Sequence, residues 1–351
     1  MPVFKKEELT DICMKLLEGM GVPEPSKSIL ASELVHCNLM GVDSHGIRQL
    51  PGYIQAIKDR KIFPNAEIKI VKETPTTAVV DCGFNFGHVG ANYLVDVAVK
   101  KAKENNIAFV VSQRCNHIGR LGAYVQKIAE QGLVGFVWAS GSRKYKNVKH
   151  GVAPWGGKES AFSTNPMAFA APTSGDPVIV DMETAMIAKG KLEYYIEHDL
   201  PMKPGFLQDE DGNPTTDPRV VYPPRKGTLL PFGYDMGHKG YCLAFMVEII
   251  SSILGGPNPE TPEGNPNIFS NEMGIIALNP NATAGNYYLS MIDELCSDIK
   301  NIKPAPGFKE VMIPGEPEFK TFKVRNEEGI PVDEKTWEII ENTAKELGVE
   351  L

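Results

Sequence analysis

The sequence predicts an α/β protein with helices at both ends of the chain and strands between them. Apolar residues within the first 60 residues, and again at residues 334–347, recur at helical spacing. From about residue 66 the pattern changes to short alternating or β-branched runs, which are typical of strands. Residues 106–138 then contain a strand-like run, a helix-like segment and a second strand-like run.

The amino-terminal region contains three predicted helices. In the first, apolar side chains from Leu9 to Leu17 follow one helix face until glycines and a proline end it. Ser26 can cap the second helix, and Asp43 or Ser44 can cap a third, shorter one. The segment Asp-Ser-His-Gly at residues 43–46 is therefore expected at a helix start.

The middle of the chain is expected to hold most of the strands. Strand-like runs surround one clear helix at residues 121–131, and these runs are residues 78–81, 106–112 and 133–138. Residues 201–231 hold seven prolines and little periodicity, which predicts long loops. The apolar run 241–254 is too short to span a bilayer and contains Glu248, so it predicts a buried helix.

Composition excludes several classes of protein. The 36 Lys and Arg residues against 44 Asp and Glu residues give a formal net charge of −8, which disfavours nucleic acid or an anionic membrane as a partner. The six cysteines are scattered without a C-x-x-C pair, which indicates reduced thiols in a cytoplasmic protein and no structural zinc. The first residues lack the apolar core of a secretory signal.

A glycine-rich turn at residues 83–90 lies where a dinucleotide-binding fingerprint would lie, between a predicted strand and a predicted helix. Its spacing is G-x-x-x-G-x-x-G rather than G-x-G-x-x-G. We therefore interpret it as a tight strand-to-helix turn and not as part of a Rossmann fold.

Two histidines lie in glycine-bounded loops. A helical start at residues 43–48 would put His45 and Arg48 on one face, as a proton donor or acceptor beside a cation for a carboxylate. The alternative is a capped helix start with an exposed histidine and arginine.

The second loop contains His117, Gly119, Arg120 and Gly122 at another predicted helix start, where free N–H groups favour phosphate. The alternative there is a capped helix with His117 in a structural hydrogen bond. Further polar turns follow apolar strands or precede helices, at residues 155–157, 163–166, 181–184, 189–191, 237–240 and 314–316. Each alone is an ordinary turn, but together they indicate a site.

Six segments, in this order, resemble the malate/L-lactate dehydrogenase family of the non-Rossmann type: DSHGIRQLPGY, NHIGRLGAY, APWGGKESAFSTNP, DMETAMIAKGK, GHKG and IPGE. The family includes sulfolactate and ureidoglycolate dehydrogenases, 2,3-diketogulonate reductase and piperideine-2-carboxylate reductase. The resemblance implies a helical substrate and dimerisation domain from both chain ends, residues 1–72 with 300–351. It also implies a mixed-sheet α/β domain for a nicotinamide cofactor at residues 73–299, and a homodimer.

The resemblance also implies roles for individual residues. His45 would be the proton donor or acceptor, oriented by Ser44, although some members use the histidine matching His117. Arg48 and Thr164 would bind the substrate. The cofactor would be lined by His117, Ile118, Gly119, Arg120, Leu121, Asp181, Met182, Glu183, Thr184, Lys191, His238, Lys239, Pro314, Gly315 and Glu316. No metal is expected.

The sequence departs from the family pattern at four places. The substrate arginine usually lies four residues after the histidine, where this chain has Gln49, and Arg48 is rotated from that position by about 100° on a helix. Glu183 replaces the first residue of a usual A-T-S segment, Pro317 replaces an arginine, and Ile118 replaces an aromatic residue. These changes bear on the choice of substrate and cofactor.

The expected reaction is hydride transfer between NAD or NADP and C2 of a small 2-hydroxy or 2-keto acid. The basic run at residues 143–149 could meet the 2′-phosphate of NADP or could be a solvated face, so the choice of cofactor stays open. A relative that binds cofactor or organic acid without turnover is the alternative. A hydrolase built on Ser44 and His45 is disfavoured, because adjacent side chains on a helix point apart.

Overall fold

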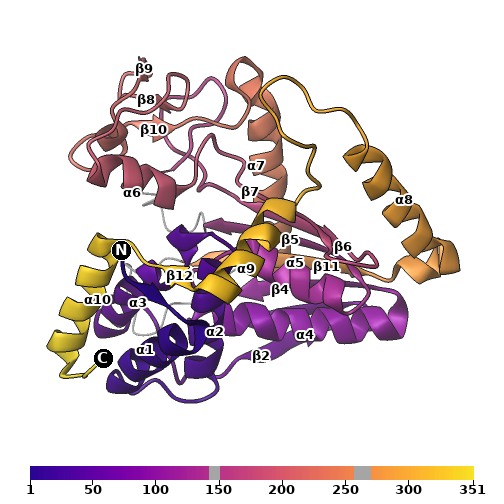
Figure 1. The fold of residues 1–351 in the computed structure, drawn as a ribbon, viewed down its shortest axis with the longest axis horizontal. Coiled ribbons are helices and arrows are strands. Elements are labelled where there is room, and N and C mark those ends of the chain that lie inside the picture. Colours follow the sequence, from indigo (N-terminus) through magenta and orange to yellow (C-terminus); the bar gives the residue numbers. More distant parts are fainter. Residues whose placement is uncertain (142–150, 257–269) are drawn as a thin grey trace.

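The computed structural model describes residues 1–141, 151–256 and 270–351. Its centre is a seven-stranded sheet in the order β2-β3-β4-β11-β5-β6-β7 (Figure 1). Only β3 and β4 run parallel, and every other neighbouring pair is antiparallel. The strands are β2 (Lys69–Glu73), β3 (Thr77–Asp81), β4 (Ile107–Gln113), β5 (Val134–Gly141), β6 (Met167–Ala171), β7 (Val178–Met182) and β11 (Asn271–Leu278). The expected mixed sheet is confirmed.

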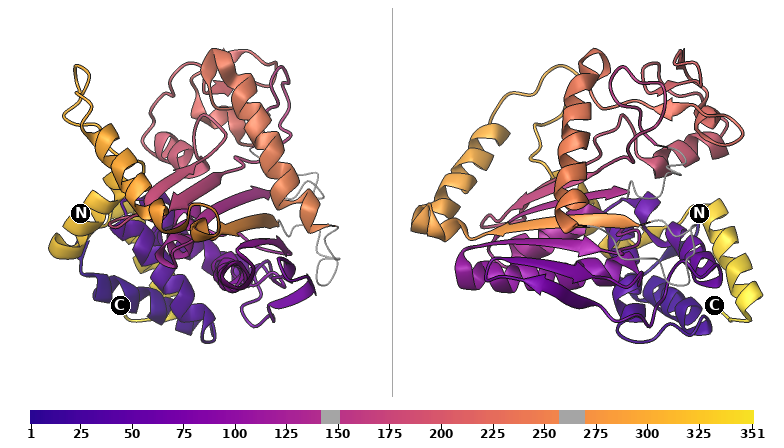
Figure 2. Two further views of the ribbon diagram at one scale, coloured as in Figure 1. Left: turned by 90° about the vertical axis from the view of Figure 1, so that its right-hand side faces the viewer. Right: turned by 180° about the vertical axis from the view of Figure 1, so that it is seen from behind.

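Helices cover both faces of this sheet. Helices α4 (Gly87–Asn105) and α5 (Leu121–Glu130) pack on one face, and their apolar sides form the main core with the strands. Helix α7 (Gly237–Ser251) lies on the opposite face (Figures 1 and 2). The glycine-rich turn at residues 83–90 is the connection from β3 to α4, which agrees with its interpretation as a strand-to-helix turn.

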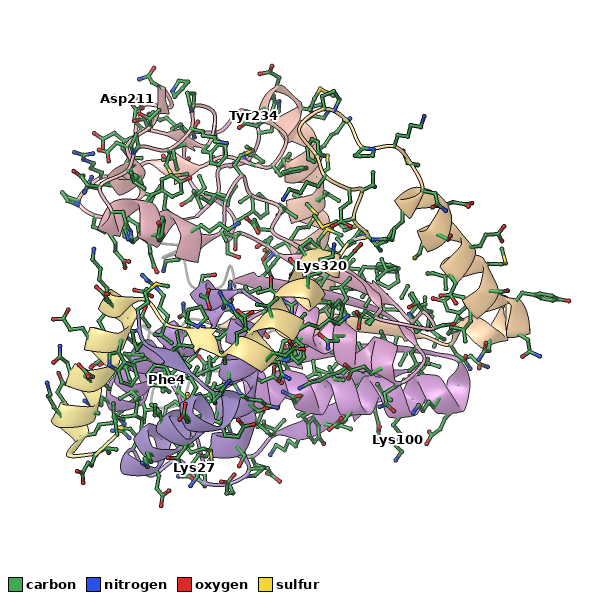
Figure 3. The ribbon with its side chains drawn as sticks, in the orientation of Figure 1. Phe4, Lys27, Lys100, Asp211, Tyr234 and Lys320 are labelled. Atoms are coloured by element: carbon green, nitrogen blue, oxygen red, sulfur yellow. The ribbon has the colours of Figure 1, made fainter. Side chains whose placement is uncertain are left out.

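Both ends of the chain build a second core. Helices α1 (Lys6–Gly19), α2 (Ser26–Leu39), α3 (Leu50–Lys58) and α10 (Glu334–Leu347) share it. Strands β1 (Val3–Phe4) and β12 (Ile330–Pro331) join the two ends, and Phe4 of β1 is labelled in Figure 3. The ring of Phe4 packs on that of Trp337 with centroids 4.6 Å apart. Helix α9 (Glu316–Glu328) packs against α2.

A third core, absent from the two-domain prediction, lies between residues 152 and 244. It includes residues of α6 (Lys189–Glu197) and of the short strands β8 (Leu207–Gln208) and β10 (Thr228–Leu229). Strand β9 (Pro214–Thr215) pairs with β8. The rest of residues 201–231 is mostly loop, as predicted. The sheet begins at Lys69, so β2 crosses the domain boundary predicted at residue 72.

Helix α8 (Tyr288–Lys300) extends from the body of the molecule and has no buried residue (Figure 1). All six cysteines are free. In the part of the chain that the structure describes, no helix combines the length and apolar character needed to cross a membrane.

Candidate active site

The segment that contains His45 is built from two short turns. The 3-10 helices η1 (Asp43–His45) and η2 (Ile47–Gln49) are separated by Gly46, whose backbone is extended. A Cβ at Gly46 would lie 2.1 Å from the side-chain oxygen of Asn38. That oxygen accepts a hydrogen bond from the backbone of Ile47 at 2.8 Å, so one asparagine fixes the break between the turns.

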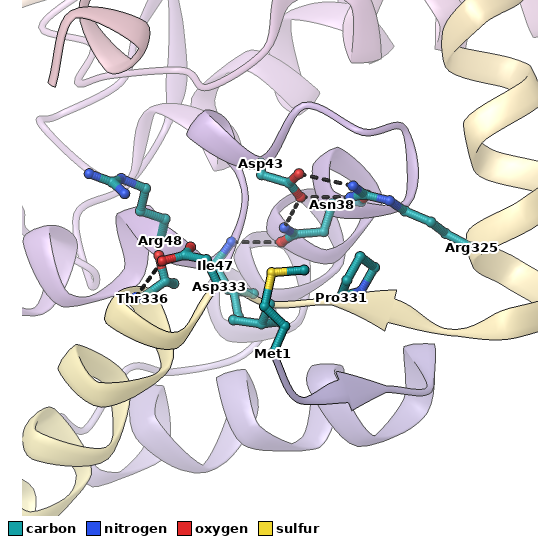
Figure 4. A pocket seen from close by; sticks show the side chains of 10 residues that line it. Met1, Asn38, Asp43, Ile47, Arg48, Arg325, Pro331, Asp333 and Thr336 are labelled. Atoms are coloured by element: carbon teal, nitrogen blue, oxygen red, sulfur yellow. Dashed lines mark hydrogen bonds and ion pairs between the residues drawn. The ribbon is translucent and has the colours of Figure 1, made fainter. Parts of the chain in front are cut away.

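This break makes one prediction wrong. His45 and Arg48 do not share the face of a continuous helix, because Gly46 interrupts it. The Arg48 guanidinium instead pairs with Glu197 at the end of α6. Arg48 also lines a pocket of about 120 Å³ whose wall includes the ion pair between Asp43 and Arg325, with N–O distances of 2.7 and 3.0 Å (Figure 4).

His45 and His117 face each other although 71 residues separate them in the chain. Their ring centroids are 5.9 Å apart and their planes are 16° from parallel. The Ser44 hydroxyl lies 3.1 Å from Nδ1 of His45, and the Tyr53 hydroxyl lies 2.7 Å from Nδ1 of His117. The two side chains of Ser44 and His45 therefore meet, and the expectation that they point apart is wrong because the turn is not an α-helix.

A third histidine, which was not among the predicted site residues, lies next to His117. His88 is the second residue of α4 and is 1% exposed. Its ring meets those of Tyr53 and His117 edge-on, with centroids 5.4 and 6.4 Å away. Neither ring nitrogen has a hydrogen-bond partner among the described residues. Gly119 lies so close that a Cβ there would be 2.5 Å from Nε2 of His88.

Burial sets the protonation of all three histidines. It lowers the pKa of His45, an effect that the charge of Asp181 opposes and that of Arg120 reinforces. Burial lowers the pKa of His117 well below its ordinary value, and it lowers the pKa of His88 to about 3. The cluster is therefore neutral near pH 7.

The start of α5 is capped by a carboxylate. The backbone N–H of Gly122 donates to Oδ2 of Asp181 at 2.8 Å, and Nε of Arg120 lies 3.4 Å from the same oxygen. The sequence left two alternatives for this helix start, a phosphate site or a capped helix with His117 in a structural hydrogen bond. In the structure Asp181 caps the helix, and His117 is hydrogen-bonded to Tyr53. Arg120 is 5% exposed, and its Nη1 has no partner in the part of the chain that the structure describes.

Several other predicted segments meet at the β7 strand. The backbone N–H of Ile179 donates to the carbonyl of Pro314 at 2.9 Å, and Gly315, with a φ of +92°, packs directly on Ile179. Glu316 forms ion pairs with Lys300 and Lys320, and the hydrogen bond from Lys300 lowers the pKa of Glu316 to about 2.

The turn that follows β7, which contains Thr184, is joined to the start of α7. The buried hydroxyl of Thr184 donates to the carbonyl of Thr164 at 3.1 Å. The Thr184 carbonyl accepts from the backbone of Phe232, on which Gly240 packs. The predicted segments at residues 117–121, 164, 181–184 and 314–316 thus contact β7 or the turn that follows it, and the segment of His238 and Lys239 is tied to the same turn.

The predicted side chains of these segments differ in burial. The side chains of Ile118 and Leu121 are buried in the main core. Lys191 and Lys239 are exposed, and the basic run at residues 143–149 lies outside the described residues. No group of three or more His, Cys, Asp or Glu side chains among the described residues could hold a metal ion.

Comparisons with known proteins agree with this fold and these motifs. The family model described as malate/L-lactate dehydrogenase matches residues 4–341. The L-sulfolactate dehydrogenase of Methanocaldococcus jannaschii is 34% identical over 99% of this chain and 98% of its own. The malate dehydrogenase of Pyrococcus horikoshii is 33% identical over 98% of this chain and 95% of its own. The solved sulfolactate dehydrogenase structure from Methanocaldococcus jannaschii has a TM-score of 0.86 at 35% identity, covering 99% of this chain and 98% of that one.

The class defined by this fold and these relatives is that of the hydroxy-acid dehydrogenases, which are oxidoreductases. The chain belongs to the malate/L-lactate dehydrogenase family. The resemblance drawn from six ordered segments is therefore confirmed.

Proposed function

We propose that this protein transfers a hydride between NAD or NADP and C2 of a small 2-hydroxy acid, with His45 as the acid and base. The observation that carries the proposal is the pair of facing imidazoles, His45 and His117, held from two different segments. The relatives are dehydrogenases of malate, sulfolactate and other hydroxycarboxylates. The preferred acid is the one with the highest kcat/KM in an absorbance assay with a panel of acids.

The residues around β7 fit a nicotinamide dinucleotide. Within residues 1–141, 151–256 and 270–351, one nitrogen of the buried Arg120 guanidinium has no partner, and a polar group of the cofactor can bind it. The cofactor, when bound, supplies or accepts the hydride. We propose that it is held by the loop of residues 117–121, the turn 181–184, Lys191, His238, Lys239 and the turn 314–316. The capping carboxylate of Asp181 argues against a phosphate at the start of α5.

In oxidation, neutral His45 takes the proton from the hydroxyl oxygen of the acid, and in reduction protonated His45 returns it. Ser44 orients the ring through Nδ1, which leaves Nε2 for the reacting oxygen. An imidazolium beside that oxygen also stabilises the negative charge that develops there. His117, fixed by Tyr53, is the alternative acid and base. Thr164 lies in a turn beside the proposed site and would contact the substrate.

An absorbance assay tests this proposal. The protein is mixed with NADH or NADPH and a panel of 2-keto acids and cyclic imino acids, and loss of the reduced-nicotinamide band is followed. Turnover with a keto acid is the expected result. Shifted nicotinamide fluorescence without turnover would instead support a binding protein. The absence of both turnover and a fluorescence shift would contradict the proposal.

The pH dependence should follow the lowered pKa of His45. Because oxidation needs the neutral ring, its kcat/KM should rise with pH through a midpoint below the ordinary histidine value of about 6.5 and then stay level. Reduction needs the protonated ring, so its kcat/KM should fall as pH rises through the same midpoint. Initial rates from pH 4.5 to 8.5 measure both. A shared midpoint above 6.5 would contradict the assignment.

We also propose a homodimer in the cytoplasm, with the helical domain and α8 in the interface. Free cysteines suit a reducing compartment. Helix α8 exposes a row of apolar side chains, Leu289, Met291, Leu295 and Ile299, and such a face is typical of a protein interface. A glutamate at Leu295 should convert a dimer to a monomer in light scattering, whereas Glu294→Gln should not. A monomeric wild type would contradict this proposal.

A further inference from the structure

A small hydroxy acid needs a cation for its carboxylate, and Arg48 is already engaged. Its guanidinium pairs with Glu197, and its side chain is one of those that line the pocket of Figure 4. Gln49, at the family's arginine position, donates its amide to the carbonyl of Ser44 at 2.8 Å. Arg120 is buried against Asp181 at the start of α5. None of these three positions offers an unpaired cation to the carboxylate.

The first turn of α6 reaches the segment of Ser44 and His45. A Cβ at Gly190 would lie 2.8 Å from Cβ of Ser44, so the two backbones are in close contact. The preceding residue is Lys189, whose side chain is half exposed. The described ion pair of Lys189 is a loose one, 4.0 Å long, with Glu193 one turn along the helix. Lys189 is thus the neighbour of the residue that contacts Ser44, and its ammonium has no close ion pair among the described residues.

The opposite end of α6 is tied to the helical domain. Glu197 receives the Arg48 guanidinium on its side chain, and its carbonyl accepts from the ammonium of Lys335 at 3.0 Å. One short helix therefore links Arg48 at its last turn to Ser44 at its first.

We propose that Lys189 binds the carboxylate of the acid substrate, and that Arg48 acts as a positioning residue that holds α6 in place through Glu197. This inference rests on the proposed function and names the recognition element within it. The substrate lies between the first turn of α6 and the two imidazoles. A lysine is a flexible point charge, so it can meet carboxylates attached to carbon skeletons of different shape.

The electrostatics of the site agree with this placement. The positive charge of Lys189 is one of the effects that lower the pKa of His117, after burial and the other two histidines. A bound carboxylate would offset that charge. The charge of Lys189 should strengthen the binding of an anion and have little effect on the binding of a neutral ligand. A comparison of the two kinds of ligand therefore tests the proposal directly.

The test compares Lys189→Gln and Lys189→Arg with Lys203→Gln, an exposed lysine of the same region. Binding of oxalate is measured by calorimetry in the presence of reduced cofactor, and KM and kcat are measured with the best keto acid. Losing a charged hydrogen bond should raise the oxalate Kd and the KM by about 10- to 100-fold in Lys189→Gln. Arginine should restore most of the affinity, and the control should match the wild type.

A neutral analogue separates charge recognition from a structural effect. The KM of methyl pyruvate, which lacks the carboxylate charge, should change little in Lys189→Gln. An equal loss for the ester and the acid would overturn the proposal, as would an unchanged oxalate Kd. If oxalate binding depends on Lys189 but the wild type never turns over, the proposed function fails and this inference holds. If the wild type reduces a keto acid but the KM of that acid is unchanged in Lys189→Gln, this inference fails and the proposed function holds.

A positioning role and a direct carboxylate-binding role for Arg48 predict different results for variants of Glu197. If Arg48 positions α6, Arg48→Gln, Glu197→Gln and the double variant should weaken oxalate binding by similar factors, because all three break one link. If Arg48 bound the carboxylate itself, Glu197→Gln would free it and binding would not weaken. That result would overturn the positioning role.

Discussion

Replacing His45 by alanine is expected to lower kcat by about 10²–10⁴-fold while the protein stays folded, since that is the usual effect of removing a general acid or base. His45 is partly exposed, and its described polar and ring contacts are with Ser44 and His117. Its loss should therefore affect proton transfer far more than stability. Steady-state rates and thermal unfolding of the same preparation measure the two effects.

The outcome separates the two histidines. The pH midpoint seen in the wild type should also disappear from the residual activity of His45→Ala. If His45→Ala keeps near wild-type turnover while His117→Ala abolishes it, the roles are exchanged. A large fall in the unfolding temperature of His45→Ala would mean that the ring is structural.

Gly87→Ala should destabilise the protein by about 1–3 kcal/mol or more and reduce activity as well, because the new methyl group has nowhere to go. It would lie 2.2 Å from the carbonyl oxygen of Asn116 and 2.3 Å from that of His117. The loop cannot easily retreat, since the Asn116 side chain donates to the carbonyls of Phe84 and Asn85 at 2.7 and 3.0 Å. Displacing His117 by even 1 Å can cost about 10²-fold in rate.

The matched control is Gly52→Ala, in α3. A Cβ at Gly52 meets nothing within 4 Å, and alanine is the better helix former by about 0.5–1 kcal/mol. Denaturant unfolding should therefore show opposite signs for the two variants. If Gly87→Ala is as stable and as active as the wild type, the close packing at the start of α4 is not a constraint.

Local patterns predicted much of the secondary structure. The carboxyl-terminal helix has the predicted bounds of residues 334–347, and α5 differs from its prediction by one residue. Both are amphipathic, so their periodicity is strong. Helix α9 was not predicted, because its face toward α2 is narrow and most of its residues are polar. Strand β11 was not predicted either, and its place between β4 and β5 is a tertiary property that no local pattern contains.

Only part of the site was predicted, because local patterns do not show which residues the fold brings together. His45 and His117 each stand out within a glycine-bounded loop, but only the fold brings them face to face. Tyr53 and His88 carried no signal of their own, since a tyrosine and a histidine near helix starts are ordinary. The direction of Arg48 depends on one extended glycine, Gly46, which spacing on an ideal helix cannot anticipate.

The position of β11 also constrains how this protein can be made. A nascent chain that has left the ribosome as far as residue 256 has no central strand, so its two half-sheets present unpaired edges to solvent. Registering β11 against both halves requires contacts across more than a hundred residues, and such non-local pairing is slow. Synthesis must therefore run most of its course before the sheet can close, and a truncation ahead of residue 271 should aggregate or be degraded rather than fold.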